Sequence, residues 1–177
     1  HGAMFGVVPF YKEAVKAGLK PVIGCECYLA PRTIADKTPQ DHEGLSHLVL
    51  LAENLEGYHH LCRLASIASI KGFYHKPRID KDLLRQYGSG LIALSACLKG
   101  QIPQLLTRGR ATEADAAARE FQKIFGEDRF FLEAQNNGVK EQTAVNQALL
   151  DMSRRLSIPL VGTNDCHYLD SGDSGTH

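Results

Sequence analysis

Residues 129–163 read RFFLEAQNNGVKEQTAVNQALLDMSRRLSIPLVGT, and this stretch decides the fold class of the chain. Two short apolar segments, at 129–134 and 159–163, have the length and composition of buried strands. Between them, apolar side chains recur at steps of three and four residues, which predicts a helix over residues 140–156 that stops before Pro159. A strand, a helix and a second strand in this order are typical of an α/β domain with mostly parallel strands.

The same alternation of apolar segments and helical spacing continues toward the N-terminus. Further strands are predicted over residues 21–30, 47–52 and 90–95. Further helices are predicted over residues 9–17, 55–69 and 113–125. Thr112 is expected to cap the start of the last helix, and Gly126 is expected to end it. Residues 31–43 are polar enough to form an exposed loop, and the tail at 170–176 shows no sign of a packed element.

Length and composition limit the classes of protein to which the chain can belong. At 177 residues and 44% hydrophobic composition, it has enough apolar material for one domain with a core. No apolar run approaches the roughly 20 residues of a membrane-spanning helix, so we expect no membrane contact. Because 20 basic residues balance 20 acidic ones, any nucleic-acid contact must be local rather than a general basic surface.

The five cysteines predict a reduced, cytoplasmic protein. Their number is odd, and none lies in the Cys-x-x-Cys spacing that is typical of zinc ribbons. We expect Cys25 and Cys27 to point to opposite faces of their strand, which argues against a metal site shared between them.

Residues with metal-binding side chains gather at the ends of the predicted strands. They are Glu26, His47, Cys97, Asp165 and His167. The C-terminal ends of parallel strands meet at one face of a sheet or barrel, where ligands bind. Imidazole, carboxylate and thiolate groups are ligands of zinc and similar divalent ions. A carboxylate such as Glu26 that bridges two ions would let bound water act as the nucleophile on a phosphoester.

Each of these residues also has a purely structural interpretation. Cys97 could be an inert buried hydrophobe, and His47 could be a hydrogen-bonded structural histidine. Glu26 is the stronger indication, since an unpaired carboxylate inside an apolar strand is costly. Glu133 could face the same cleft, point outward or form an ion pair. The remaining central histidines are interpreted as surface or packing residues: His42, His59, His60 and His75.

Several blocks of the sequence resemble one protein family. They are residues 1–6, 18–26, 47–52, 72–80, 94–98 and 163–169. Together they are similar to the PHP (polymerase and histidinol phosphatase) domain of bacterial DNA polymerase III alpha subunits, and the resemblance covers essentially the whole chain. The block GFYHKPRID at residues 72–80 is the most specific, because it separates the polymerase branch from the histidinol phosphatases.

The resemblance implies a fold and a metal site. In the family, the domain is a distorted seven-stranded (β/α) barrel whose strand ends hold up to three metal ions. Matching motifs imply a ligand set of His1, Glu26, His47, Cys97, Asp165 and His167. The implied ions are zinc, manganese or magnesium. The metal-bound water would be the nucleophile, and the resemblance implies no separate catalytic side chain.

The resemblance further implies that residues 1–177 are a single PHP domain that is cut at both ends. In the family, a strand carrying His-x-His opens the domain, and it would precede residue 1. The polymerase region would follow residue 177. Without the first strand, the barrel lacks an element and the site lacks several ligands. A second interpretation of residues 1–4 is a remnant of tag removal, which would take His1 off the ligand list.

The function that the resemblance implies is that of a cytoplasmic, replicative DNA polymerase whose PHP domain hydrolyses phosphoesters. The substrate would be a 3′ terminal nucleotide of DNA during proofreading, which is a 3′–5′ exonuclease reaction. The implied partners are DNA, through the parent polymerase, and other replicative subunits that include a proofreading exonuclease. One alternative is a metal-stabilised scaffold that docks a separate exonuclease. A weaker alternative is a small-molecule phosphatase of the histidinol phosphatase kind.

Overall fold

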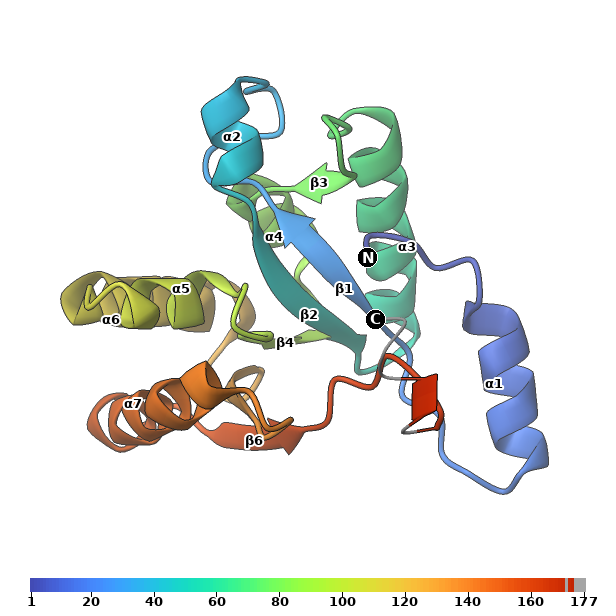
Figure 1. The fold of residues 1–177 in the computed structure, drawn as a ribbon. Coiled ribbons are helices and arrows are strands. Elements are labelled where there is room, and N and C mark those ends of the chain that lie inside the picture. Colours follow the sequence, from blue (N-terminus) through green and yellow to red (C-terminus); the bar gives the residue numbers. More distant parts are fainter. Residues whose placement is uncertain (171, 174–177) are drawn as a thin grey trace.

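A mixed β-sheet forms the frame of the computed structural model, which describes residues 1–170 and 172–173 (Figure 1). Its strands are β1 (Gly24–Leu29), β2 (Ser46–Ala52), β3 (Arg78–Ile79), β4 (Leu91–Leu94), β5 (Phe130–Gln135) and β6 (Leu160–Thr163). They lie side by side in the order β3-β1-β2-β4-β5-β6. The β1–β2 and β2–β4 pairs are antiparallel, whereas the β1–β3, β4–β5 and β5–β6 pairs are parallel.

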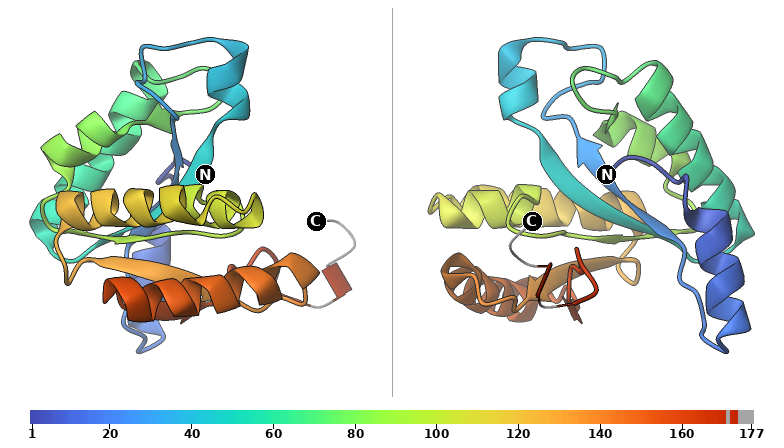
Figure 2. Two further views of the ribbon diagram at one scale, coloured as in Figure 1. Left: turned by 90° about the vertical axis from the view of Figure 1, so that its left-hand side faces the viewer. Right: turned by 45° about the vertical axis from the view of Figure 1, so that its right-hand side comes forward.

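Helices connect these strands and cover the sheet. They are α1 (Val7–Lys16), α2 (Pro39–Glu43), α3 (Leu55–Ile70), α4 (Lys81–Tyr87), α5 (Gln101–Thr107), α6 (Ala111–Phe125) and α7 (Lys140–Leu156). α3 packs on β1 to β4, whereas α6 and α7 lie side by side against the other end of the sheet (Figure 2). α1 stands at the margin and has no buried residue (Figure 1). No described helix combines the length and apolar composition that crossing a bilayer requires.

The α/β class predicted from residues 129–163 is confirmed, and α7 has the predicted limits. All predicted strands and helices are present, with most ends shifted by a few residues.

The residue predicted to cap the start of α6 is wrong. Its N-cap is Arg110 rather than Thr112, and the Arg110 guanidinium makes two 2.5 Å hydrogen bonds to the carboxylate of Glu113. Gly126 ends this helix as predicted, with a φ of 99°.

The expectation of an exposed loop over residues 31–43 is wrong in part, because this segment contains α2 and its Asp41 is buried. The sequence pattern also does not predict β3, α4 or α5. These elements are short, and a short element carries too few residues for a periodic pattern to be recognised. Within the predicted tail, residues 171 and 174–177 lie outside the described residues.

The expectation of mostly parallel strands needs correction at the centre of the sheet, where both pairings of β2 are antiparallel. Neighbouring parallel strands need a crossover connection, usually a full helix. The connection from β1 to β2 holds only the five-residue α2, and the chain turns back instead. The six described strands do not amount to the seven-stranded barrel, which remains an expectation of the resemblance.

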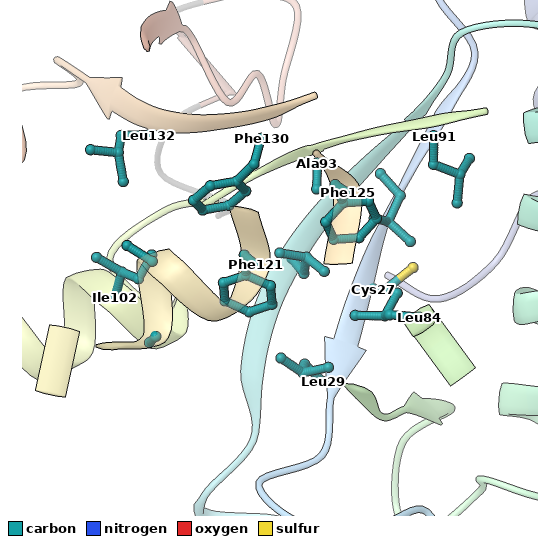
Figure 3. Close-up of a cluster of buried hydrophobic side chains, with 14 of the residues drawn as sticks. Cys27, Leu29, Leu84, Leu91, Ala93, Ile102, Phe121, Phe125, Phe130 and Leu132 are labelled. Carbon is teal, nitrogen blue, oxygen red and sulfur yellow. The ribbon is translucent and has the colours of Figure 1, made fainter. Parts of the chain in front are cut away.

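One face of the β1–β2 pair lies at the centre of the hydrophobic core (Figure 3). Cys25, Cys27 and Leu29 of β1 are buried on this face, opposite Leu48 and Leu50 of β2. The expectation that Cys25 and Cys27 point to opposite faces is wrong, because side chains two residues apart in a strand lie on the same face. Both cysteines are free thiols within the core.

Phe130 joins β5 to α6 in this core. Its side chain is fully buried, and its ring stacks on that of Phe121 with the ring centres 5.3 Å apart (Figure 3). Phe130→Ala should lower the free energy of unfolding by about 3–5 kcal/mol, because it removes buried apolar surface and leaves a cavity. Urea denaturation measures this change. Phe73→Ala, at a residue that is 54% exposed, is the control and should change little; similar losses in both variants would contradict this packing.

Candidate metal centre

Glu26 and His47 meet on the face of the β1–β2 pair that points away from the core. In the antiparallel register, Tyr28 lies opposite His47 and Glu26 lies opposite Val49, so these side chains share one face. His47 Nδ1 lies 2.8 Å from Glu26 Oε1. His47 stands at the start of its strand, yet it reaches the C-terminal end of β1 because β2 runs in the opposite direction.

His1 completes a group of three metal-binding side chains. Its Nε2 lies 2.8 Å from Glu26 Oε2. The ligand atoms of His1, Glu26 and His47 all lie within 4.8 Å of one another, a spacing at which they could hold one ion. Gly2 fixes the position of His1, since its N–H donates to the Glu26 carbonyl oxygen at 2.7 Å. The φ of Gly2 is 74°, and a Cβ there would lie 2.6 Å from Pro77, so the site requires glycine.

Cys97 reaches this group from a tight turn that follows β4. Its Sγ lies 3.5 Å from His47 Nδ1 and 3.9 Å from Glu26 Oε1. The N–H of Gly100 donates to the Cys97 carbonyl oxygen at 2.8 Å and closes the turn. A Cβ at Gly100 would lie 1.9 Å from the carbonyl oxygen of Ser95, so no other residue fits this turn unchanged. The turn therefore holds the thiol beside the imidazole.

Two opposing effects act on the pKa of His47. Burial of the ring lowers this pKa, but hydrogen bonds with Cys97 and Glu26 outweigh burial and raise it from 6.5 to about 9. The imidazole is therefore protonated at neutral pH when no ion is bound. A divalent ion that binds His47 Nδ1 must displace this proton, so protons and metal ions compete for the site.

An open cleft of about 1190 Å³ lies next to this group. Five of the six ligands implied by the sequence line it: His1, His47, Cys97, Asp165 and His167. Glu26, the sixth, contacts His1, His47 and Cys97. Asp165 and His167 come from the segment after β6, where His167 Nδ1 lies 2.8 Å from the Asp165 carbonyl oxygen. Both face the cleft, but they are not in the group whose ligand atoms lie within 4.8 Å of one another.

Sequence reasoning missed several side chains that line the cleft. The strand period could have revealed Tyr28, since it lies two residues after Glu26 and shares its face. Lys76 and Lys99 lie in loops, where no periodicity indicates the direction of a side chain. Lys76 Nζ lies 5.6 Å from the centre of the Tyr28 ring. His42, interpreted from the sequence as a surface or packing residue, also lines the cleft.

Asp41 holds α2, and with it His42, at the cleft. Its carboxylate accepts hydrogen bonds from the Arg32 guanidinium at 2.9 and 2.7 Å. It also accepts hydrogen bonds from the Thr38 hydroxyl at 2.6 Å and from the Thr38 N–H at 3.0 Å. The bonds from Arg32, followed by those from Thr38, keep the pKa of Asp41 well below its usual range.

The sequence leaves open whether Glu133 faces the cleft, points outward or forms an ion pair. In the structure its side chain points inward and is only 5% exposed. Its Oε1 accepts hydrogen bonds from the Thr163 hydroxyl at 2.5 Å and from the Gln135 amide at 3.1 Å. Its backbone N–H donates to the Ser95 hydroxyl at 2.8 Å. Glu133 thus ties β5 to the ends of β4 and β6, from which the chain runs on to the predicted ligands.

Comparison with known proteins now identifies the family. A profile of the PHP domain matches residues 1–137, which is more than half of the chain. The chain belongs to the PHP domain family. The matched residues include His1, Glu26, His47 and Cys97, whereas Asp165 and His167 lie beyond them.

Relatives of this PHP domain resemble it over almost its whole length. The chain is 47% identical over 175 residues to DNA polymerase III subunit alpha of Borreliella burgdorferi, which covers 98% of the chain. The chain is 46% identical to the same subunit of Thermus aquaticus, in an alignment of 179 residues that covers 100% of the chain. It is 45% identical to the subunit of Treponema pallidum, in an alignment of 175 residues that covers 98% of the chain. The chain spans about 15% of the length of each of these relatives.

Asp41→Asn should destabilise the chain most at neutral pH. A carboxyl group whose pKa is lowered by folding adds stability above its unfolded pKa, and this stability is lost as pH falls through the folded pKa. The difference in melting temperature from the wild type should therefore be largest near pH 7 and shrink below about pH 4. Thermal melts across this range measure it. Asp82→Asn, in an exposed ion pair with Arg85, is the control and should have little effect; a difference that persists in acid would contradict the role of Asp41.

Proposed function

We propose that this chain contributes to a multinuclear, metal-dependent phosphoesterase centre within a replicative DNA polymerase alpha subunit of the bacterial cytoplasm. The observation that carries the proposal is the group of His1, Glu26 and His47, whose ligand atoms lie within 4.8 Å of one another. Cys97 lies 3.5 Å from His47 and adds a thiol. Two imidazoles, a carboxylate and a thiol fit the nitrogen, oxygen and sulfur ligands that zinc and related divalent ions take.

The two carboxylate oxygens of Glu26 support a site with more than one ion. Oε1 faces His47 and Oε2 faces His1, so the carboxylate can contribute one oxygen to each of two ions. Asp165 and His167 bring further ligands from the segment after β6 to the same cleft. When bound, divalent ions supply an activated water and neutralise the charge of a phosphate group.

The remaining side chains of the cleft favour a nucleic-acid strand end as the substrate. Lys76 and Lys99 line the cleft and can attract phosphate groups. The Tyr28 ring stacks on the His1 ring with the ring centres 5.4 Å apart, so it helps to hold this ligand in the cleft. A cleft of about 1190 Å³ that is open to solvent admits part of a chain rather than only a small molecule. Because the relatives are DNA polymerase III alpha subunits, we infer removal of a 3′ terminal nucleotide during proofreading.

This function implies that the chain works within a replication complex. DNA would be the substrate and the shared partner of the parent polymerase. Other polymerase subunits would be its protein partners. The alternative function, a scaffold whose ions serve only folding and which docks a separate exonuclease, uses the same ligands but performs no hydrolysis.

Glu26→Gln tests the proposal, because it removes the charge that contacts both histidines while nearly preserving the shape of the side chain. We expect the variant to bind Zn²⁺ and Mn²⁺ at least about 10–100-fold more weakly. Elemental analysis after dialysis counts the ions, and release of nucleotides from 3′-labelled single-stranded DNA measures the activity. Glu113→Gln, in an exposed ion pair with Arg110, is the matched control and should retain the wild-type ion content.

The outcomes separate the competing functions. Wild-type chain that binds ions and hydrolyses DNA, with both properties lost in Glu26→Gln, supports the phosphoesterase. Ions that raise the melting temperature without any hydrolysis support the scaffold. Cleavage of small phosphomonoesters but not of DNA supports a small-molecule phosphatase. A wild-type chain that binds no ion would overturn the metal centre itself.

A further inference from the structure

We propose that Lys76 binds a phosphate group of the substrate strand, and that the segment at residues 72–80 holds its ammonium group beside the metal centre. The proposal deepens the function above and rests on it, since the strand is the one whose end the cleft would take up. The segment comprises part of the loop after α3, the strand β3 and Asp80, the N-cap of α4. The block GFYHKPRID would then have a function in binding as well as in folding.

Arg78 anchors the two ends of this loop to each other. Its side chain is fully buried, and its guanidinium donates to the carbonyl oxygen of Gly72 at 2.9 Å. The same guanidinium lies 5.4 Å from the centre of the Tyr74 ring. A Cβ at Gly72 would overlap the carbonyl oxygen of Arg78, so the loop can close onto β3 only with glycine at this position. The middle of the loop, with His75 and Lys76, is therefore presented from a fixed base.

The tip of the loop has a backbone conformation that is unusual for its residue. His75 has a φ of 58°, in the left-handed region that residues other than glycine adopt only at a cost. Its ring packs on that of Tyr74, with the ring centres 4.5 Å apart, and on that of His42 from α2, at 4.6 Å. The Tyr74 N–H donates to the carbonyl oxygen of Lys76 at 3.1 Å. These contacts fix the direction in which the Lys76 side chain leaves the loop.

The Lys76 side chain reaches the open cleft that His1 and His47 also line. Its Nζ lies 5.6 Å from the centre of the Tyr28 ring. The centre of that ring lies 5.4 Å from the centre of the His1 ring and 5.3 Å from that of His47. The ammonium group is thus one aromatic ring away from both imidazoles of the metal group. A phosphate group held at the metal group would lie within reach of this long, flexible side chain.

The positive charge of Lys76 is available to a ligand. Within residues 1–170 and 172–173, aspartate and glutamate form ion pairs with Lys16 and Lys81 but not with Lys76. A cation–π contact at an exposed site is weaker than a charge-assisted hydrogen bond to a phosphate oxygen, so a phosphate can draw the ammonium group off the Tyr28 ring. The ring therefore positions this charge without competing with the substrate.

Lys76→Met tests this role, because it removes the charge and nearly keeps the length of the side chain. The metal-free chain, which cannot hydrolyse DNA by the proposed reaction, is titrated with fluorescein-labelled single-stranded oligo-dT at several NaCl concentrations. Fluorescence anisotropy measures the binding. Loss of one phosphate contact should reduce the slope of log affinity against log salt by about 0.7, and should weaken binding in about 0.1 M NaCl about fivefold. Lys76→Arg keeps a cation and should retain the wild-type slope.

Lys123→Met is the matched control, since Lys123 is exposed on α6 and does not line the cleft. It should show the wild-type slope. Both methionine variants should take up as much Mn²⁺ and Zn²⁺ as the wild type in elemental analysis, because neither lysine is a ligand. If Lys76 only holds the loop, Lys76→Met should melt at a lower temperature and keep the wild-type salt slope, and that result would overturn the proposal.

The same measurements distinguish failure of this inference from failure of the proposed function. A wild type that binds ions, together with a wild-type salt slope in Lys76→Met, overturns the role of Lys76 and leaves the metal centre in place. An equal loss of slope in Lys76→Arg and Lys76→Met also overturns it, because the charge would then not be the cause. A wild type that binds ions but no DNA overturns both Lys76 and the nucleic-acid substrate. A wild type that binds no ion overturns the proposed function itself.

Discussion

The antiparallel register of β1 and β2 is the constraint on which both the core and the candidate site depend. It pairs Tyr28 with His47 and Cys27 with Leu48, so that one face of the two strands is apolar and the other carries Glu26 and His47. Because the side-chain period of a strand is two, a slip by one residue would move the carboxylate into the core and the apolar residues into the cleft. The hydrophobic effect that fixes this register therefore also sets the 2.8 Å contact between His47 and Glu26.

The sequence predicts those parts of the molecule in which a long periodic pattern exists. α7 has its predicted limits because a repeat of apolar residues extends over its whole length between strand-like segments. Glu26, His47 and Cys97 could be selected as candidate ligands because Glu26 interrupts an apolar strand, His47 opens one and Cys97 follows one. The direction of β2 could not be predicted, since alternation looks the same in parallel and antiparallel strands. The inward orientation of Glu133 could not be predicted either. It depends on hydrogen bonds with Thr163 and Ser95, which lie 30 and 38 residues away in the sequence.

The block at residues 72–80 shows how a motif can be recognised before its role is known. Its Arg78 is fully buried, and the guanidinium donates to the carbonyl oxygens of Gly72, Ile34 and Asp36 at 2.9–3.0 Å. Asp80 accepts from the N–H of Ile34 at 2.8 Å. These bonds connect β3 to the segment before α2, and so they fix one wall of the cleft. A buried guanidinium needs hydrogen-bond acceptors, and backbone carbonyl oxygens of the loop supply them here. These hydrogen bonds also restrict the conformation of the loop.

Glu26 and Glu133 illustrate two solutions to the same electrostatic problem. Glu26 lies between two imidazoles, and the proton that His47 carries at neutral pH balances its charge when no ion is bound. A divalent ion that displaces this proton therefore raises the charge of the site by only one unit. Glu133 has only neutral donors, and hydrogen bonds from the Thr163 hydroxyl and the Gln135 amide stabilise its Oε1 instead. Because Thr163 ends β6, the bond to its hydroxyl helps to position the segment that carries Asp165 and His167.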